Sequence, residues 1–133
     1  MDDLKLEKLI SYWTEHAEYD IETAQAMFDS KRYPYALFMC HLAVEKILKG
    51  RVVFCTKEHA EYTHNLVRLA QQAHLQFSKE QLSLLEALQD FNMEARYPEE
   101  EKEFYKRATM DFSENYLTAA KLLFVWIKTS LKK

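Results

Sequence analysis

Arg96 precedes Tyr97-Pro98 directly, and this short segment holds the side chain best suited to bind a phosphate. Proline fixes its own backbone and restricts the residue before it, so the chain next to Arg96 is stiff. A guanidinium held in one orientation donates two parallel hydrogen bonds to a phosphate. Four glutamates follow at positions 99, 100, 101 and 103, and they compete for the same guanidinium. We expect Arg96 to contact a ligand; the alternative is a local ion pair.

Two further polar pairs occur at helical spacing. His41 and Glu45 are four residues apart and Lys46 and Lys49 are three apart, so each pair shares a helix face, although the two pairs need not point the same way. For His41, ligand binding competes with the role of a core histidine bonded to a carboxylate or a carbonyl. Asp20 lies beside an apolar stripe, and we expect it to pair with a backbone donor or with a lysine or arginine of the next helix.

Potential metal ligands are sparse. Cys55, His59 and His64 supply three ligands if the preceding helix extends far enough, but a fourth is missing and structural zinc sites usually show paired spacings. Glu61 and His64 form a single E-x-x-H motif, whereas a di-iron centre needs that motif on two helices and further glutamates. A metal site is therefore the less favoured alternative, and we predict neither a metal nor a cofactor.

The segment 33–54 must position most of these side chains. Pro34 fits the first turn of a helix, and the ten residues 35–44 are apolar except for His41, which predicts a helix covered on several sides. Apolar residues at three- and four-residue steps predict an earlier helix over about 4–29, joined to it as an antiparallel hairpin. Gly50 marks either a close approach of another backbone or a weak point of the helix.

Shorter helices follow. Thr63 is the predicted N-cap of a third helix, and Ser78 with Gln81 predicts a capping box for a fourth that continues to about Ala95. The acidic segment 99–107 is expected to be exposed and mobile, before a last helix over about 109–131. With one Gly and two Pro, the chain is predicted to form one all-α domain over residues 1–133, an up-and-down bundle of four to five helices.

Composition and charge favour a cytoplasmic protein. Two cysteines in apolar surroundings, without a charged-then-apolar leader, indicate reduced structural thiols. The ten-residue apolar run is about half of what a bilayer requires, so no membrane span is expected. Residues 31–57 carry six basic and one acidic side chain, whereas residues 1–30 carry eight acidic and two basic ones. This distribution predicts a local basic patch for a polyanion.

Several fragments in order resemble the HEPN family (higher eukaryotes and prokaryotes nucleotide-binding domain): CHLAVEKILKG, the preceding HAEYDIETAQAMFDSKRYPYALF, THNLVRLA and ARYPEEE. Ribonuclease members carry an arginine, four to six residues and then a histidine before the last long helix. Arg96 has that place, but Glu101, Lys102 and Glu103 stand where the histidine would fall, so the nuclease motif is broken. Arg68 and His74 match the spacing on the third helix, away from the family's location, and we interpret this match as chance.

The resemblance implies a non-nucleolytic, nucleotide- or RNA-phosphate-binding module, with a minimal nucleotidyltransferase as partner in a toxin–antitoxin-like pair. Its alternative is a metal-independent ribonuclease with an altered motif, so enzymatic activity stays open, leaning towards none. A homodimer is expected because so apolar a second helix is hard to cover, and because Phe38, Met39 and Trp126 offer apolar surface. The ligand-binding residues implied by the resemblance are Arg96, Asn92, Tyr97, Lys46, Lys49 and His41.

Overall fold

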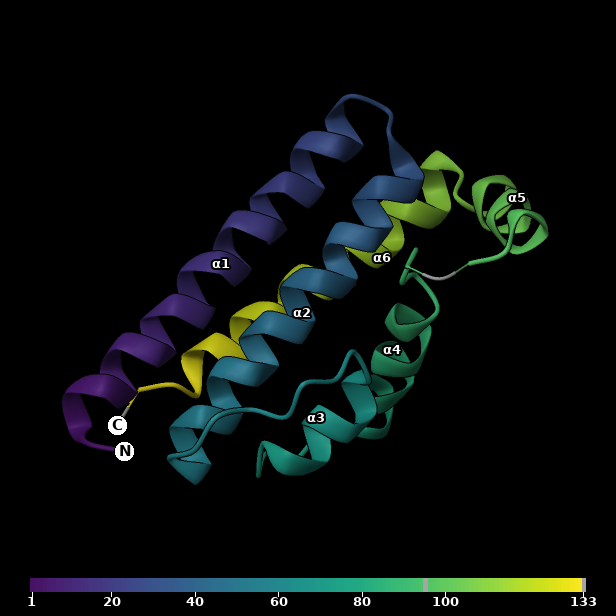
Figure 1. Ribbon diagram of the computed structural model, residues 1–133. Helices are drawn as coiled ribbons and strands as arrows, with labels where there is room; N and C mark the ends of the chain where they lie inside the picture. Colours follow the sequence, from purple (N-terminus) through teal and green to yellow (C-terminus); the bar gives the residue numbers. More distant parts are fainter. Residues whose placement is uncertain (95, 133) are drawn as a thin grey trace.

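The computed structural model describes residues 1–94 and 96–132, and every regular element in them is a helix. The predicted all-α bundle is confirmed, with six helices rather than four to five. Figure 1 shows the three long helices side by side, both termini at one end of the bundle and α5 at the other. The helices are α1 (Asp3–Asp29), α2 (Tyr33–Thr56), α3 (Leu66–Gln72), α4 (Lys79–Gln89), α5 (Pro98–Arg107) and α6 (Met110–Thr129).

Helices α1 and α2 form the predicted hairpin. The side chain of Asp2 caps α1 by accepting a hydrogen bond from the Lys5 amide at 2.8 Å. The turn into α2 contains Lys31 with a positive φ of 64°, and Pro34 occupies the first turn of α2. Gly50 lies where the two helices approach closely, because a Cβ there would be 3.3 Å from the Cβ of Trp13. The close-approach interpretation of Gly50 is therefore correct, and α2 continues through it without a break.

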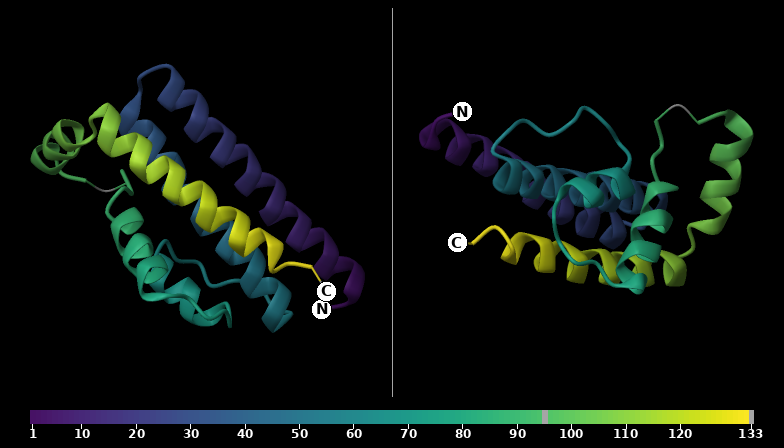
Figure 2. Two further views of the ribbon diagram at one scale, coloured as in Figure 1. Left: turned by 180° about the vertical axis from the view of Figure 1, so that it is seen from behind. Right: turned by 90° about the horizontal axis from the view of Figure 1, so that it is seen from below.

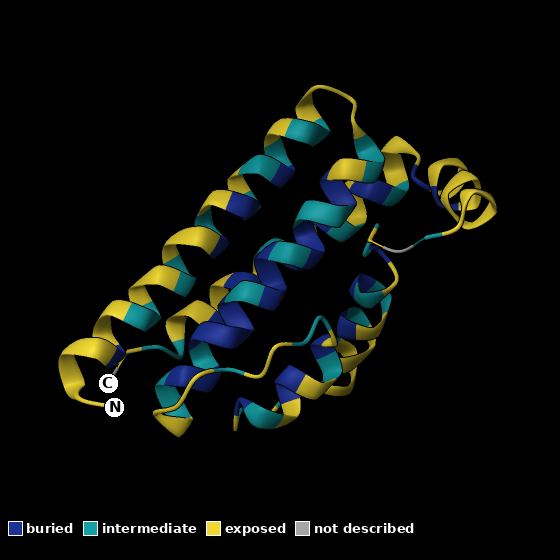
Figure 3. Cartoon of the chain, viewed as in Figure 1, coloured by how far each residue is buried: buried dark blue, intermediate teal, exposed yellow. Residues whose placement is uncertain are grey.

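Helix α2 is the centre of the molecule. Among its residues only Tyr35 and Thr56 are exposed, because α1, α6 and the α3–α4 pair cover different sides of it (Figures 2 and 3). One chain therefore covers this apolar helix, and the need for a second copy to do so was overestimated. Phe38 and Met39 are half-buried. Three exposed apolar side chains, Leu122, Val125 and Trp126, lie at helical spacing on α6.

Two boundaries differ from those predicted. Asn65 rather than Thr63 caps α3, and Thr63 instead accepts a hydrogen bond from the Asn65 amide at 3.1 Å. The capping box of Ser78 and Gln81 is confirmed, but α4 ends at Gln89. Its predicted end, Ala95, lies outside the described residues. The chain turns after Gln89 because Phe91 is fully buried and packs its ring 5.7 Å from that of Phe104 on α5.

The acidic segment 99–107 was expected to be exposed and mobile, and it forms the helix α5. Its sequence suits a helix, with Pro98 at the start, three glutamates in the first turn and two basic residues in the last. Phe104 is 1% exposed and anchors the helix, while its neighbours on either side are exposed as predicted. Hydrophobic anchoring by one residue left no apolar periodicity from which a helix could be predicted.

Within residues 1–94 and 96–132, no helix is long and apolar enough to cross a bilayer. The two cysteines are free thiols, one buried and one half-buried. Burial raises the pKa of Cys40 to about 12, despite the opposing charge of Lys121, so this thiol is not reactive. Burial also raises the pKa of the Cys55 thiol, and the charge of Arg51 opposes this effect.

Candidate functional site at Arg96 and the buried cluster behind it

Arg96 is held in a defined orientation just before α5. Its Nε donates a hydrogen bond to the Asn92 carbonyl at 2.8 Å, and its guanidinium carbon lies 4.7 Å from the centre of the Phe104 ring. This stacked arrangement on a buried aromatic ring restricts the side chain. Tyr97 contributes little to it, since its side chain is 72% exposed and its backbone caps α5. The orientation of Arg96 is thus fixed by Asn92 and Phe104.

A surface pocket of about 340 Å³ opens beside this guanidinium. It contains a second guanidinium, that of Arg107, which lies over the Phe112 ring at 5.6 Å. Among the described residues, Arg96 forms no ion pair with the glutamates of α5. The pocket therefore combines two cations with three carboxylates and one aromatic wall. Its lining residues are Arg96, Glu99, Glu100, Glu103, Phe104 and Arg107.

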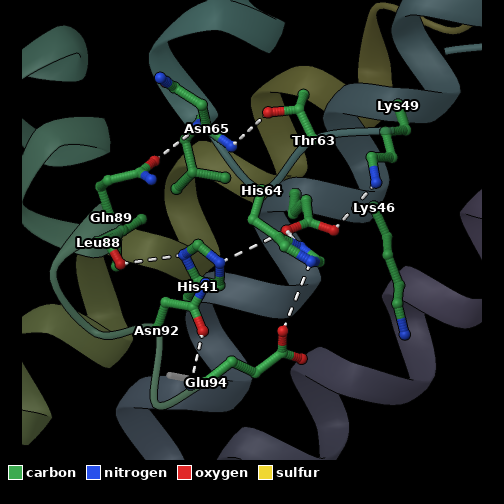
Figure 4. Close-up of polar contacts among 12 residues, drawn as sticks. His41, Lys46, Lys49, Thr63, His64, Asn65, Leu88, Gln89, Asn92 and Glu94 are labelled. Atoms are coloured by element: carbon green, nitrogen blue, oxygen red, sulfur yellow. Dashed lines mark hydrogen bonds and ion pairs between the residues drawn. The ribbon is translucent and has the colours of Figure 1, made fainter. Parts of the chain in front are cut away.

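A buried polar cluster lies on the face of α2 towards α4 (Figure 4). Its centre is Glu45, whose Oε1 accepts a hydrogen bond from His64 Nδ1 at 2.8 Å and whose Oε2 accepts one from Lys49 Nζ at 3.2 Å. His41 Nε2 lies 3.4 Å from Oε1, which is close enough for an ion pair. The geometry is not that of a hydrogen bond. The other nitrogen of His41 faces the Leu88 carbonyl at 3.2 Å. His41 is thus placed as a core histidine between a carboxylate and a carbonyl.

Glu45 is ionised in this environment. Burial raises the pKa of its carboxyl, but the contacts with His41 and His64 and the charges of Lys49 and His64 outweigh burial and lower that pKa to about 2. Lys49 is also buried, and its ammonium lies 5.3 Å from the Trp13 ring and 5.8 Å from the Tyr62 ring. The cluster is therefore an internal charge network around the buried carboxylate of Glu45.

Lys46 points the other way, towards α1. Its Nζ lies 2.6 Å from Asp20, so the predicted partner of Asp20 on the second helix is confirmed. Arg51 is also engaged, donating to the carbonyls of Ala73 and Ser130 at 2.9 Å each, where it ties together the ends of α3 and α6. Lys46, Lys49 and Arg51 are half of the basic residues in 31–57, and the expected basic surface patch is accordingly reduced to its exposed remainder.

The residues singled out by the sequence thus fall into three places. Arg96, Asn92 and Tyr97 stand at the start of α5, while His41 and Lys49 lie in the buried cluster. Lys46 lies against α1. Neither lysine lines the pocket at Arg96.

Sequence reasoning missed the residues that connect these places. Glu94 lies 3.5 Å from His64 Nε2, and its backbone amide donates to Asn92 Oδ1 at 2.9 Å. Gln89 accepts a hydrogen bond from the Leu66 amide at 2.6 Å, which fixes the start of α3 against the end of α4. No local spacing predicts the contacts of Glu94 with His64 and of Gln89 with Leu66, because these partners are remote in sequence. For Glu94 the only signal is its position two residues before Arg96.

Other motifs contribute no site. Arg68 forms an ion pair with Glu61, whereas His74 follows the end of α3 with a φ of 53°, in agreement with a chance match to the nuclease spacing. The three positions that replace the family's histidine, 101 to 103, are exposed on α5. Over the part of the chain that the structure describes, no group of three or more His, Cys, Asp or Glu side chains is placed to hold a metal ion.

The sequence matches the family model of the HEPN domain over residues 10–130. The chain belongs to the HEPN domain family. No curated protein matches the sequence. The fold of this HEPN chain is similar to that of TT1696 from Thermus thermophilus, with a TM-score of 0.75 and 18% identity over 90% of this chain and 96% of that one. It is also similar to ST0689, an archaeal HEPN homologue, with a TM-score of 0.74 and 20% identity over 92% and 98% of the two chains. At these identities the two structures support the HEPN fold.

Proposed function

We propose that this HEPN domain binds a nucleotide or an RNA phosphate at Arg96 and does not cleave RNA. The observation that carries the proposal is the fixed guanidinium at the pocket, held by Asn92 and Phe104 through its Nε and its face. These contacts leave the two terminal nitrogens as donors towards the pocket, and a planar pair of donors suits two oxygens of one phosphate. Arg107 supplies a second cation on the same pocket.

The glutamates favour a nucleotide over free phosphate. Glu99, Glu100 and Glu103 would repel an inorganic anion, but carboxylates accept hydrogen bonds from ribose hydroxyls and from amino groups of bases. A ligand with a phosphate for the guanidinium and a sugar for the carboxylates matches both halves of the pocket. Tyr97, which is exposed next to Arg96, offers a face on which a base can stack.

Absence of nuclease activity follows from the residues at the motif. Glu101, Lys102 and Glu103 supply no neutral imidazole to move a proton, and all three are exposed on α5. We expect any background RNA cleavage to be unchanged in Arg96→Ala. Cleavage by the wild-type protein that disappears in this variant would favour the alternative, a metal-independent ribonuclease with an altered motif.

The assembly belongs to the same proposal. The family resemblance suggests a minimal nucleotidyltransferase as partner, in a cytoplasmic toxin–antitoxin-like pair. A homodimer is supported by the exposed apolar residues Leu122, Val125 and Trp126 on α6. Light scattering should then report about twice the mass of the chain. A monomer at tens of micromolar protein would contradict the proposed dimer but not the proposed ligand site.

The binding experiment is a calorimetric titration of the protein with nucleoside monophosphates and a short single-stranded oligoribonucleotide. Wild type should bind at least one of them, and Arg96→Ala should lose the signal. Arg68→Ala is the matched control, because Arg68 is an exposed arginine paired with Glu61 away from the pocket. Equal binding by wild type and Arg96→Ala would overturn the proposal.

A further inference from the structure

A continuous set of polar contacts links the buried cluster on α2 to Arg96. Glu45 accepts a hydrogen bond from His64 at 2.8 Å, and His64 reaches Glu94 at 3.5 Å through its second nitrogen (Figure 4). The Glu94 amide donates to the Asn92 side chain at 2.9 Å, and the Asn92 carbonyl accepts from Arg96 at 2.8 Å. The turn that holds Arg96 is therefore linked to the Glu45 cluster through His64, in addition to the packing of Phe91 in the core.

The two nitrogens of His64 have different partners. An ionised carboxylate only accepts hydrogen bonds, so the proton of a neutral imidazole lies on Nδ1, where it is donated to Glu45. Nε2 then presents a lone pair to the carboxylate of Glu94, and no hydrogen bond forms. Protonation gives Nε2 a proton and converts this contact into a charge-assisted hydrogen bond. Only the charged form of His64 therefore holds both carboxylates.

The surroundings of His64 allow this change. Glu45, Lys49 and His41 face it from α2, Glu94 faces it from the segment after α4, and Tyr62 of its own loop lies at 6.0 Å. The His64 side chain is 37% exposed and that of Glu94 is 58% exposed, so a proton from water reaches the contact. Histidine is the side chain whose charge changes between about pH 5 and pH 8.

We propose that His64 is a positioning residue for the Arg96 site, and that its protonation tightens the site by fixing Glu94 and, through Glu94, the turn of Asn92 and Arg96. The inference rests on the proposed function for its ligand. The anchoring itself is a property of the free protein. Affinity for an RNA phosphate should thus rise as the pH falls, since the binding-competent orientation of Arg96 becomes more populated.

The first experiment needs no ligand. Hydrogen exchange of the segment around Asn92 and Arg96 is compared at about pH 6 and pH 8, after correction for the intrinsic pH dependence of exchange. Wild type should be more protected at the lower pH. His64→Gln should show no such difference, because its amide does not become charged.

Glu94→Gln gives an independent test at an exposed residue. A glutamine amide can donate to the lone pair of a neutral His64 and accept from the N–H of a protonated one, so protection in this variant should differ little between the two pH values. His59→Gln is the matched control, because His59 is an exposed histidine of the same loop and contacts neither carboxylate. It should behave as wild type. Equal protection at both pH values in wild type, or a pH effect that persists in His64→Gln, would overturn the inference.

The second experiment measures binding of a short oligoribonucleotide, whose phosphodiesters keep one charge each throughout this pH range. Wild type should bind about fivefold more tightly at the lower pH, a modest coupling between two sites, and His64→Gln should lose that ratio. If protection changes as expected and no oligonucleotide binds, the inference stands and the proposed function fails. If the oligonucleotide binds through Arg96 with the same affinity at both pH values, the function stands and the positioning role fails.

Discussion

The Glu45 cluster and the Arg96 pocket are built from the same kinds of side chain and differ in how their charges are satisfied. In the cluster, one buried carboxylate faces two histidines and a lysine, and little of it reaches solvent. In the pocket, two arginines are held by an aromatic ring or a carbonyl and their charges remain open to solvent and ligand. A buried charge network stabilises one arrangement of the fold, whereas an oriented but unpaired charge is available for binding.

The largest expected effect is the loss of the Glu45 charge. Glu45→Gln leaves Lys49 buried without its anion, and removal of one member of a buried ion pair typically lowers the free energy of unfolding by about 3 to 5 kcal/mol. Urea unfolding measures this value, with Glu86→Gln on the exposed side of α4 as a control that should match wild type. Replacing Glu45 and Lys49 together by Leu and Met should cost less than Glu45→Gln alone. If Glu45→Gln leaves the free energy of unfolding unchanged, the Glu45 cluster does not stabilise the fold and resembles the pocket in this respect.

Acid should act on the same carboxyl. Its pKa is lowered from 4.5 to about 2 in the folded protein, so the contribution of Glu45 to stability is present above pH 4.5 and is lost as the pH falls through about 2. At about 1.4 kcal/mol per pKa unit, the loss is on the order of 3 kcal/mol. The free energy of unfolding, measured from pH 5 downward, should therefore fall less steeply in Glu45→Gln than in wild type. If the free energy of unfolding falls equally steeply with pH in both proteins, carboxyls other than Glu45 cause the acid sensitivity.

Arg51 gives a second comparison with Arg96, because its guanidinium binds backbone carbonyls and has a structural role. It donates to the last carbonyls of α3 and to Ser130 at the end of α6, which lack partners within their helices. Arg51→Ala should lower the free energy of unfolding by about 2 kcal/mol, the scale of a hydrogen bond from a charged donor. In a thermal melt, the exposed Arg68→Ala should stay close to wild type. If Arg51→Ala and Arg68→Ala lower stability equally, the hydrogen bonds from Arg51 to the carbonyls make no particular contribution to stability.

Much of the fold follows from local sequence. Pro34, the capping box of Ser78 and Gln81, and the apolar steps of the long helices predicted the elements that the structure contains. Helix α5 was missed because a single anchor, Phe104, produces no periodicity, although its acidic first turn and basic last turn were visible in the sequence. Caps depend on one or two residues and are easily displaced, as Asn65 replaced Thr63.

The site was less predictable, and the reason is physical. Spacing along α2 correctly placed Glu45 with His41, one turn away. It also put Lys46 on one face with Lys49, whereas Lys46 pairs with Asp20 and Lys49 with Glu45. Spacing did not predict which charged side chains would pair with partners remote in sequence. Lys46 pairs with Asp20, and Glu45 pairs with His64, nineteen residues away. Counting basic residues in a segment therefore overestimates a basic surface, because burial turns some of them into structural donors.

Arg96 should have the smallest effect on stability of the residues compared. Arg96→Ala removes one hydrogen bond to a carbonyl and a stacking contact with Phe104, both at a half-exposed position, and should lower the free energy of unfolding by only about 1 kcal/mol. The same substitution should abolish binding of the oligoribonucleotide, which no Glu45 variant that remains folded should do.

Arg96→Lys separates charge from shape at this position. It keeps the cation but loses the planar pair of donors and the stacking on Phe104, so binding should weaken and become more sensitive to salt, because a point charge acts at longer range than a pair of fitted hydrogen bonds. If Arg96→Lys binds as wild type does, the pocket recognises charge alone, and the orientation imposed by Asn92 and Phe104 has no role in binding. If Arg96→Ala instead unfolds the protein at the cost expected for Glu45, Arg96 belongs with the structural charges and the ligand site lies elsewhere.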